Sequence, residues 1–379
     1  MSEKKVGRRD LLKLLGTGAA GLVVGGLVGY GAAPAKVVQV SGAATTATQA
    51  QTVAPTLPAS KGFEVAWLEE TILGMTWPKL ETAAKRGAIV LVPVGPVEAH
   101  GTHLPVATDL LVTTATCVLV KRHLADVGVE AVIGPPYYCT ADAGGYHEEP
   151  PTPPSITMLF PGTISTSPSR MSQNILDVIA CMGDDGFRKF FILNNHGGLG
   201  QQEGIYGAVK AASEGKVKNP QTGALFTPPL EVYWVDPISP VGDVTSGLRT
   251  KYGLTLKEPF WLNWRDLIPA SATSSLKSSP PRTHAEEIET SADMYFYPDL
   301  VDWDAWRRLP PGTRWLDPQS IAEAGALIAK GDLEGAKKIA PEMIIGDATV
   351  ASAETGKNYW ELTGQLIAQA IQERLQGKR

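Results

Sequence analysis

The sequence has little cysteine, few aromatic residues and no excess of positive charge. Only three of its 379 residues are cysteine, placed singly at Cys117, Cys139 and Cys181, which fits neither a disulfide framework nor a cysteine-based zinc site. Its 34 basic and 39 acidic residues leave a net charge of -5, and lysine or arginine runs are missing beyond the N-terminus. Such a chain offers no basic surface to a phosphate backbone, so we expect no nucleic-acid partner.

The first 35 residues differ from the rest of the chain. Arg8 and Arg9 precede a Gly- and Ala-diluted apolar stretch over about 14–28, and Ala33-Pro34-Ala35 forms a small-x-small cleavage pattern. This segment resembles a twin-arginine export signal. An uncleaved membrane anchor is the alternative, for which the stretch is short and weakly apolar. We therefore predict a signal peptide over 1–35, contact with a membrane only during export, and a periplasmic or other extracytoplasmic location.

Small polar residues from 36 to 62 predict a flexible linker, and residues 63–379 form the predicted folded domain. In that domain short apolar runs such as "AIVLVPVG", "KFFILNN" and "LEVYWVD" alternate with longer helical patterns. This alternation is typical of parallel strands joined by helices. The expected fold class is therefore α/β, a three-layer α/β/α sandwich around a mostly parallel sheet.

Polar clusters follow two of these predicted strands. Glu98, His100 and His103 come after "AIVLVPVG", with Asp109 at the start of the next helix, and His196 comes after "KFFIL". Functional loops in such sheets lie at the carboxyl ends of the strands. Taken singly, any one of these residues could equally be an ordinary polar side chain at the end of a strand. Together, carboxylate and imidazole without thiolate indicate a site for a divalent ion such as Zn²⁺ or Mn²⁺.

A third polar cluster is "RTHAEEIETSADMYF", residues 282–296. Thr283 and Glu286 have the spacing of a capping box, which predicts a structural role for Glu286 in a helix that begins at Thr283. On a helical wheel Glu289 lies at the edge of the apolar stripe, where a buried carboxylate needs a partner such as a metal ion, and Glu287 points further out. His284 borders the opposite edge, where it could shuttle a proton.

Three motifs resemble those of the creatininase (creatinine amidohydrolase) family: "PVGPVEAHGTHLPVATD", "NNHGGL" and "HAEEIETS". "FPGTIS" and "GDATVASAETGK" are similar to further family segments, so the resemblance spans about 88–357. It implies an amide hydrolase with two metal ions. Glu98 and His196 would hold one ion, His100 and a second acidic residue the other, and Asp109 would bridge them. We choose Glu289 as that second acid, because the wheel and the motif's Glu-Thr-Ser agree.

The sequence also departs from the family pattern. Glu286 stands where the family usually has glycine, and the segment 141–158, with His147, is longer than the corresponding connection in the family it resembles. The segment 301–345 has no family counterpart that we can place. Trp261 and Trp264 precede the third motif, as tryptophans do in creatininase. These departures bear on the substrate more than on the chemistry.

The expected cofactors are two divalent ions, zinc and/or manganese, with iron as a further candidate. They would lower the pKa of a bridging water, so that hydroxide attacks the carbonyl carbon of a cyclic amide and the C–N bond is cleaved. His284 would donate a proton to the leaving nitrogen, helped by Glu287. Two alternatives remain: a lactone or C–C bond hydrolase acting on a cyclic or sugar-derived keto compound, and an exported binding protein stabilised by metal. We expect a small-molecule substrate and a homo-oligomer.

Overall fold

Parallel strands with helices between them make up the computed structural model, which describes residues 69–141, 159–238, 245–269, 276–277, 284–312, 318–339 and 341–379. All of these residues belong to a single compact unit. The expected signal peptide (1–35), the linker (36–62), the start of the domain at 63, and the loop residues 142–158 with His147 lie outside the described residues. None of the helices formed by the described residues is long and apolar enough to span a membrane.

The sheet has five strands in the order β2-β1-β3-β4-β5, and every neighbouring pair is parallel. Their bounds are β1 Ile89–Val94, β2 Ala131–Ile133, β3 Lys189–Asn194, β4 Glu231–Val235 and β5 Trp261–Leu262. This arrangement confirms the fold class expected from the alternating sequence pattern.

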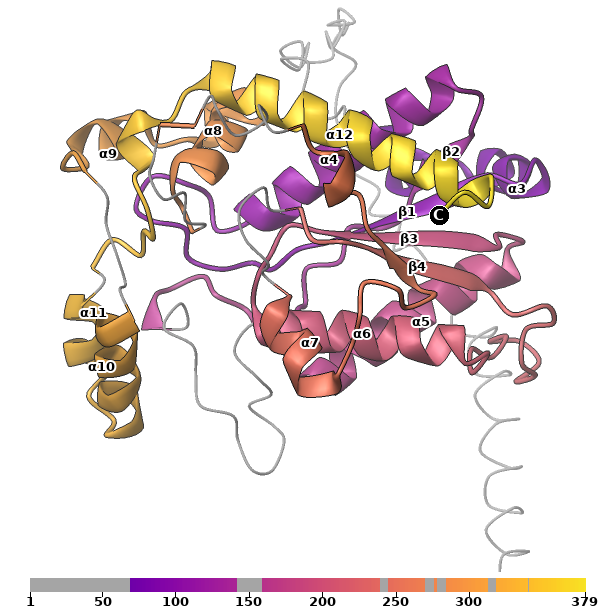
Figure 1. Cartoon of the computed structure of the whole chain (residues 1–379), viewed down its shortest axis with the longest axis horizontal. Coiled ribbons are helices and arrows are strands. Elements are labelled where there is room, and N and C mark those ends of the chain that lie inside the picture. Colours follow the sequence, from indigo (N-terminus) through magenta and orange to yellow (C-terminus); the bar gives the residue numbers. More distant parts are fainter. Residues whose placement is uncertain are drawn as a thin grey trace, which may run out of the picture. The chain divides into compact units, whose positions relative to one another are not determined.

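Helices cover both faces of the sheet (Figure 1). On one face lie α4 Thr108–Asp126, α8 Glu287–Phe296 and α12 Ala353–Leu375. The other face is covered by α3 Trp77–Lys85, α5 Pro168–Asp184, α6 Leu199–Ser213 and α7 Ser246–Tyr252. Short 3₁₀ helices occur at η1 Ile72–Gly74, η3 Arg265–Leu267, η4 Pro298–Leu300 and η5 Ala348–Val350.

Strand β1 shows why its sequence reads as an unbroken apolar run. All six of its residues are buried, because successive side chains point to opposite faces and both faces carry helices. Ile89 and Leu91 belong to the core on the α4 and α12 side, whereas Val90, Val92 and Val94 belong to the core on the α5 and α6 side. The strand is thus a rigid central element, and the loop that follows it starts from a fixed point.

Helices α8 and α12 pack so closely that their backbones are in contact. A Cβ atom built on Gly356 of α12 would lie 1.9 Å from the backbone oxygen of Ser291 in α8. Only a hydrogen atom fits there, so the glycine permits the close contact. In addition, the Ser352 amide donates a hydrogen bond of 3.0 Å to the Ser291 hydroxyl. Helix α12 therefore sets the position of α8 against the sheet.

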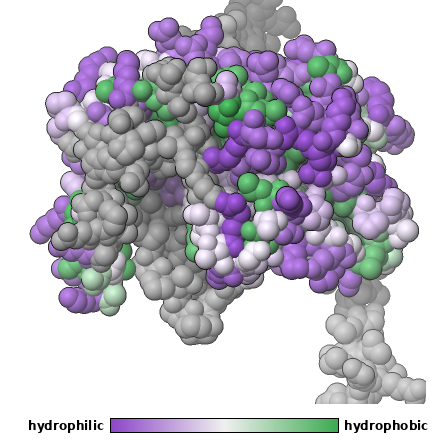
Figure 2. All heavy atoms as spheres, viewed as in Figure 1, coloured by the Kyte–Doolittle hydropathy of each residue, from purple (hydrophilic) through white to green (hydrophobic). Residues whose placement is uncertain are grey.

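The segment 301–345 forms three further helices, α9 Trp303–Arg308, α10 Pro318–Ala329 and α11 Leu333–Ile339. Ala324 of α10 and Ala336 of α11 are buried together with Leu159 in a small separate core. The segment rejoins the body at Ile345, whose amide donates a 2.8 Å hydrogen bond to the His284 carbonyl. Hydrophilic residues predominate on the described surface that Figure 2 shows, and apolar residues form only small patches there.

Candidate metal centre

The polar clusters meet where the strand order changes direction. From β1 the chain passes through α4 to β2 on one side, and from β2 it passes through α5 to β3 on the other side of β1. The loops after β1 and β3 therefore start from the carboxyl ends of neighbouring strands and lead into helices on opposite faces of the sheet, α4 and α6. Ligands of open α/β sheets bind at such a switch point. Glu98 and His100 follow β1, and His196 follows β3.

The loop after β1 is held by backbone contacts that aim its side chains. The Glu98 amide donates a 2.8 Å hydrogen bond to the Val106 carbonyl, which closes the loop on itself. Nδ1 of His100 lies 3.1 Å from the Glu98 carbonyl oxygen, so this nitrogen carries the ring proton and donates it. The other ring nitrogen, Nε2, then presents a lone pair, which is the form of histidine that binds metal ions.

His196 reaches the same point from the loop after β3. Its Nδ1 lies 3.1 Å from Oε1 of Glu98 and 3.1 Å from Oδ2 of Asp109. The carbonyl of His196 accepts a 2.9 Å hydrogen bond from the Asn194 side chain at the end of β3. These three side chains, Glu98, Asp109 and His196, form a first group whose ligand atoms all lie within 4.8 Å of one another.

A second group shares Asp109 with the first. Nε2 of His100 lies 3.5 Å from Oδ2 of Asp109 and 3.5 Å from Oε2 of Glu289. His100, Asp109 and Glu289 again have ligand atoms within 4.8 Å of one another. The structure thus brings together all five residues that the sequence predicts as metal ligands, with Asp109 common to both groups. Their roles as ligands stay a prediction.

The donor set of this cluster fits divalent cations. Glu98 and Asp109 are each 1% exposed and Glu289 is 7% exposed, so three carboxyl groups share one dehydrated space. Burial raises the pKa of Asp109, but the neighbouring imidazoles of His100 and His196 hold its pKa below the usual range. Burial lowers the pKa of His100, and the carboxylates of Asp109 and Glu289 raise it well above its usual value. The cluster therefore favours positive charge at its centre, which a metal ion supplies.

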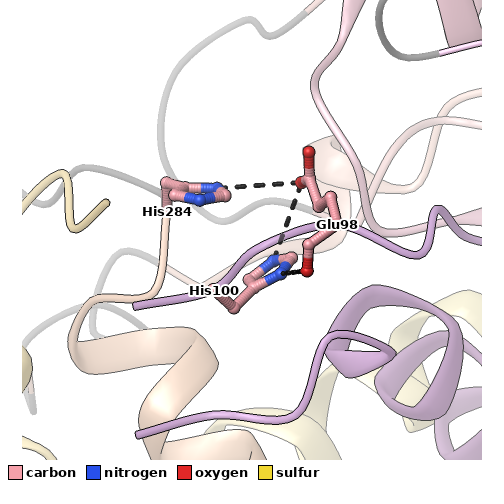
Figure 3. A group of neighbouring side chains, drawn as sticks. All are labelled: Glu98, His100 and His284. Atoms are coloured by element: carbon pink, nitrogen blue, oxygen red, sulfur yellow. Dashed lines mark hydrogen bonds and ion pairs between the residues drawn. The ribbon is translucent and has the colours of Figure 1, made fainter. Parts of the chain in front are cut away.

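His284 lies on the other side of Glu98. Figure 3 shows the imidazoles of His100 and His284 directed toward the Glu98 carboxylate, and their ring centres are 4.6 Å apart. Nε2 of His284 lies 2.8 Å from the Ala99 carbonyl, so it donates, and Nδ1 faces Oε1 of Glu98 at 3.7 Å. Burial lowers the pKa of His284 to about 3. Glu98, His100 and His284 form a third group with metal-ligand spacing.

The start of α8 differs from the expected capping box. Helix α8 begins at Glu287, with Glu286 as its N-cap and with the Oε1 atom of Glu286 accepting a 3.0 Å hydrogen bond from the Ile288 amide. The structural role of Glu286 is confirmed, whereas the helix start at Thr283 is wrong, and Thr283 itself lies outside the described residues. Ala285 has a φ of 53°, and its amide donates a 2.5 Å hydrogen bond to Oε2 of Glu289. This contact directs Glu289 back toward the cluster.

Glu287 is fully buried, so its expected outward position is wrong. Both of its carboxylate oxygens accept hydrogen bonds of 2.9 Å from the Lys277 amide. The wheel failed because Lys277 lies ten positions earlier in the chain and covers a face that periodicity alone assigns to solvent. Helping His284 stays a prediction for Glu287, and the contact with Lys277 ties the preceding segment to the start of α8.

Two tryptophans that resemble those of the family lie in the core. The ring of Trp261 is tilted by 49° against that of Trp234, with their centres 4.9 Å apart, and the Trp264 indole donates a 2.8 Å hydrogen bond to the Asp236 carbonyl. Both side chains are 1% exposed. Three apolar side chains on segments that adjoin the loops of the cluster are 40–49% exposed: Val106 in the loop after β1, Ile164, whose amide donates to the Val97 carbonyl of that loop, and Leu199 at the start of α6.

Comparisons with known proteins agree on one family. A family model described as creatininase, creatinine amidohydrolase, matches residues 74–371. A creatinine amidohydrolase of Pseudomonas putida is 26% identical over 307 residues, which cover 79% of this chain and 95% of the relative. A 3-dehydro-scyllo-inosose hydrolase of Thermotoga maritima is 25% identical over 297 residues, covering 75% of this chain and 76% of the relative. A solved structure of a creatininase mutant complexed with creatine has the same fold, with a TM-score of 0.52, 21% identity, and coverage of 80% and 98% of the two chains.

Proposed function

Because the chain belongs to the creatininase family of metal-dependent amidohydrolases, we propose that it cleaves the C–N bond of a cyclic amide at a site for two divalent ions. The observation that carries this proposal is Asp109, whose carboxylate belongs to both the Glu98–His196 group and the His100–Glu289 group. A carboxylate shared in this way can bridge two ions, and each group then offers further nitrogen and oxygen ligands of the kind that Zn²⁺ and Mn²⁺ prefer.

The bound ions would supply Lewis acidity to the scissile carbonyl and lower the pKa of a water molecule. Everything else in the reaction falls to side chains of the chain itself. Glu98, Asp109 and Glu289 hold negative charge around the reaction centre, and their burial excludes bulk water from it. His100 is fixed in one tautomer by the Glu98 carbonyl, so its Nε2 points at the centre without reorganising.

His284 is the proposed proton carrier. The Ala99 carbonyl fixes the Nε2 proton of His284, so Nδ1 remains the nitrogen that can take up a proton beside Glu98. Burial lowers the pKa of His284 and keeps this ring neutral near pH 7, so Nδ1 has the lone pair that it needs to take up a proton before delivering it to the leaving nitrogen. Glu287 keeps its predicted assisting role as part of this proposal, acting on His284 through the start of α8.

Two observations bear on the kind of substrate. Val106, Ile164 and Leu199 are exposed apolar side chains on segments that adjoin the loops of the cluster, which favours a substrate with an apolar part over a heavily hydroxylated one. The similarity to the 3-dehydro-scyllo-inosose hydrolase favours the second candidate, a lactone or C–C bond hydrolase acting on a cyclic keto compound. Both candidates use the same five side chains, so only the substrate distinguishes them.

The test is a hydrolysis screen of purified protein reconstituted with Zn²⁺ or with Mn²⁺. The panel contains cyclic amides, linear amides, lactones and cyclic polyol ketones, and Asp109→Ala serves as the inactive control. Turnover of cyclic amides alone supports the proposal. Turnover of lactones or ketones without amides would replace it by the second candidate, and metal binding without any turnover would favour the binding-protein alternative. Sedimentation of the same sample measures whether the expected homo-oligomer forms.

A further inference from the structure

A buried carboxyl group outside the five proposed ligands contacts the helix that carries Asp109. Asp293 lies one turn after Glu289 on α8 and is fully buried. Its Oδ2 atom lies 2.7 Å from Oγ1 of Thr108, the first residue of α4 and the residue before Asp109. The same Thr108 hydroxyl lies 2.8 Å from the carbonyl oxygen of Pro105.

These two oxygen–oxygen distances indicate whether the Asp293 carboxyl group carries a proton. The Thr108 hydroxyl has one hydrogen, and the Pro105 carbonyl can only accept. If Asp293 were a carboxylate, two acceptors would compete for that single hydrogen, and one oxygen–oxygen contact below 3 Å would have no proton in it. If Asp293 carries a proton, Asp293 donates to Thr108 and Thr108 donates to Pro105. Only this arrangement makes both short contacts hydrogen bonds.

The second oxygen of Asp293 agrees with a neutral group. Within the described part of the chain Oδ1 has no hydrogen-bond partner, and it is shielded from solvent. An ionised carboxylate with one dehydrated oxygen left unpaired is costly, whereas a neutral acid tolerates such a place better. Burial raises the pKa of Asp293 to about 7, with Thr108 and His100 opposing this shift and Glu289 and Asp109 adding to it.

We propose that Asp293 is kept as a neutral carboxylic acid that donates a hydrogen bond to Thr108, and that this contact positions Asp109 for its two groups. The positioning role rests on the proposed function, because the proposed function is what makes Asp109 the shared ligand. The protonation state of Asp293 does not depend on that function.

The placement of the contact explains how it acts. Thr108 begins α4, so a shift of its backbone moves the adjacent Asp109. Helix α8 contacts the same loop a second time, where Nε2 of His103 lies 2.8 Å from Oγ1 of Thr290. Helix α8 thus contacts the loop through Thr290 and Asp293, and it supplies Glu289 from the position directly before Thr290. Asp293 is a positioning residue in this arrangement, since it acts on the cluster only through Thr108.

Five variants of the Zn²⁺-loaded protein test the proposal: Asp293→Asn, Asp293→Leu, Thr108→Ser, Thr108→Val and the control Thr116→Val. Thr116 is a buried threonine of the same helix whose hydroxyl bonds only to Val112 among the contacts that the structure shows. Competition with a chelator measures Zn²⁺ affinity. Asp293→Leu and Thr108→Val should weaken it by about tenfold or more, as second-layer changes do. Asp293→Asn keeps an N–H donor, so it and Thr108→Ser should retain affinity, as should Thr116→Val.

Infrared difference spectra of the unchanged protein and Asp293→Asn give a readout that does not depend on folding of the disruptive variants. We expect a carbonyl-stretch band of a protonated carboxyl group that disappears in Asp293→Asn. Absence of this band near pH 6 would overturn the protonation claim. Equal loss of Zn²⁺ affinity in Asp293→Asn and Asp293→Leu would also overturn it, because it would show that the negative charge of Asp293 supports Zn²⁺ binding. Unchanged affinity in Asp293→Leu would overturn the positioning role. If these results hold while no cyclic amide is hydrolysed, the proposed function fails and this inference stands.

Discussion

Nε2 of His103 lies 2.8 Å from Oγ1 of Thr290, so the second histidine of the first motif contacts helix α8. Its neighbour His100, three positions earlier, faces the carboxylates of Asp109 and Glu289 instead. One loop therefore uses one histidine for the cluster and another to attach the loop to a helix that comes almost two hundred residues later. The two histidines of this motif therefore have different roles.

The first prediction concerns pH and His103. Burial lowers the pKa of His103 from its ordinary 6.5 to about 4, so between these values the unfolded chain binds the extra proton. The stability due to neutral His103 is therefore complete above about pH 6.5 and is lost as the pH falls toward 4, by at most about 3 kcal/mol. Urea unfolding against pH measures this loss. His103→Gln cannot be protonated, so a curve parallel to that of the unchanged protein would contradict the prediction.

The second prediction concerns the number of metal ions. Asp109→Ala should lose both ions, because both groups use its carboxylate, whereas His196→Ala should lose mainly one. Elemental analysis of purified protein gives the metal content per chain. His123→Ala, which changes a histidine in the last turn of α4, is the matched control and should keep both ions. Full content in Asp109→Ala would rule out a shared ligand.

The third prediction separates two glutamates of one helix. Glu286→Ala removes the N-cap bond to Ile288 and should lower the free energy of unfolding by roughly 1 kcal/mol, with activity largely kept. Glu289→Gln keeps the shape of the side chain but removes its charge, so metal affinity and turnover should both fall. Thermal unfolding and chelator competition measure the two effects. Metal loss in Glu286→Ala with none in Glu289→Gln would exchange the two roles.

The fourth prediction concerns His284. His284→Gln should lower kcat strongly while metal content stays full, because the proposed role is proton transfer. Glu287→Gln should also keep the metal, and it lowers the rate only if His284 depends on it. Loss of one ion in His284→Gln would instead assign His284 as a ligand beside Glu98 and His100, the third group that its position permits.

The fifth prediction concerns export, which we propose from the pattern of residues 1–35. Replacing Arg8 and Arg9 by lysine should trap the uncleaved precursor inside the cell, because the twin-arginine pathway reads the arginine pair. Fractionation followed by mass measurement locates the chain and its N-terminus. Export at the normal level in the double variant would contradict the assignment.

The strands and the meeting of the candidate ligands could be predicted from the sequence because their signals are local. The apolar run before Glu98 forms strand β1 as expected, and the helix expected to start at Asp109 is α4, Thr108–Asp126. Carboxyl ends of neighbouring parallel strands meet at one edge, so Glu98 and His196 could be placed together without coordinates. Five candidate ligands came from this rule and the motif.

Contacts between distant segments could not be predicted in the same way. Glu287 is covered by the Lys277 backbone, and Asp293 is paired with Thr108 across 185 positions. A helical wheel ranks positions by the hydrophobicity of one helix and contains no information on which backbone amide or hydroxyl will face a buried carboxyl group. The helix start was wrong for a related reason, since Glu286 satisfies the first amides itself.

Through its backbone contact with Ser291, Gly356 of helix α12 affects the position of the proposed metal ligands. A single added methyl group at residue 356 would meet the Ser291 oxygen and displace α8, and with it Glu289 and the Asp293 contact to Thr108. The substitutions tolerated at position 356 are therefore limited by the geometry of the metal cluster, although residue 356 lies outside that cluster. Gly356→Ala should therefore weaken metal binding, whereas alanine at the exposed positions Lys357 and Asn358 should leave it unchanged.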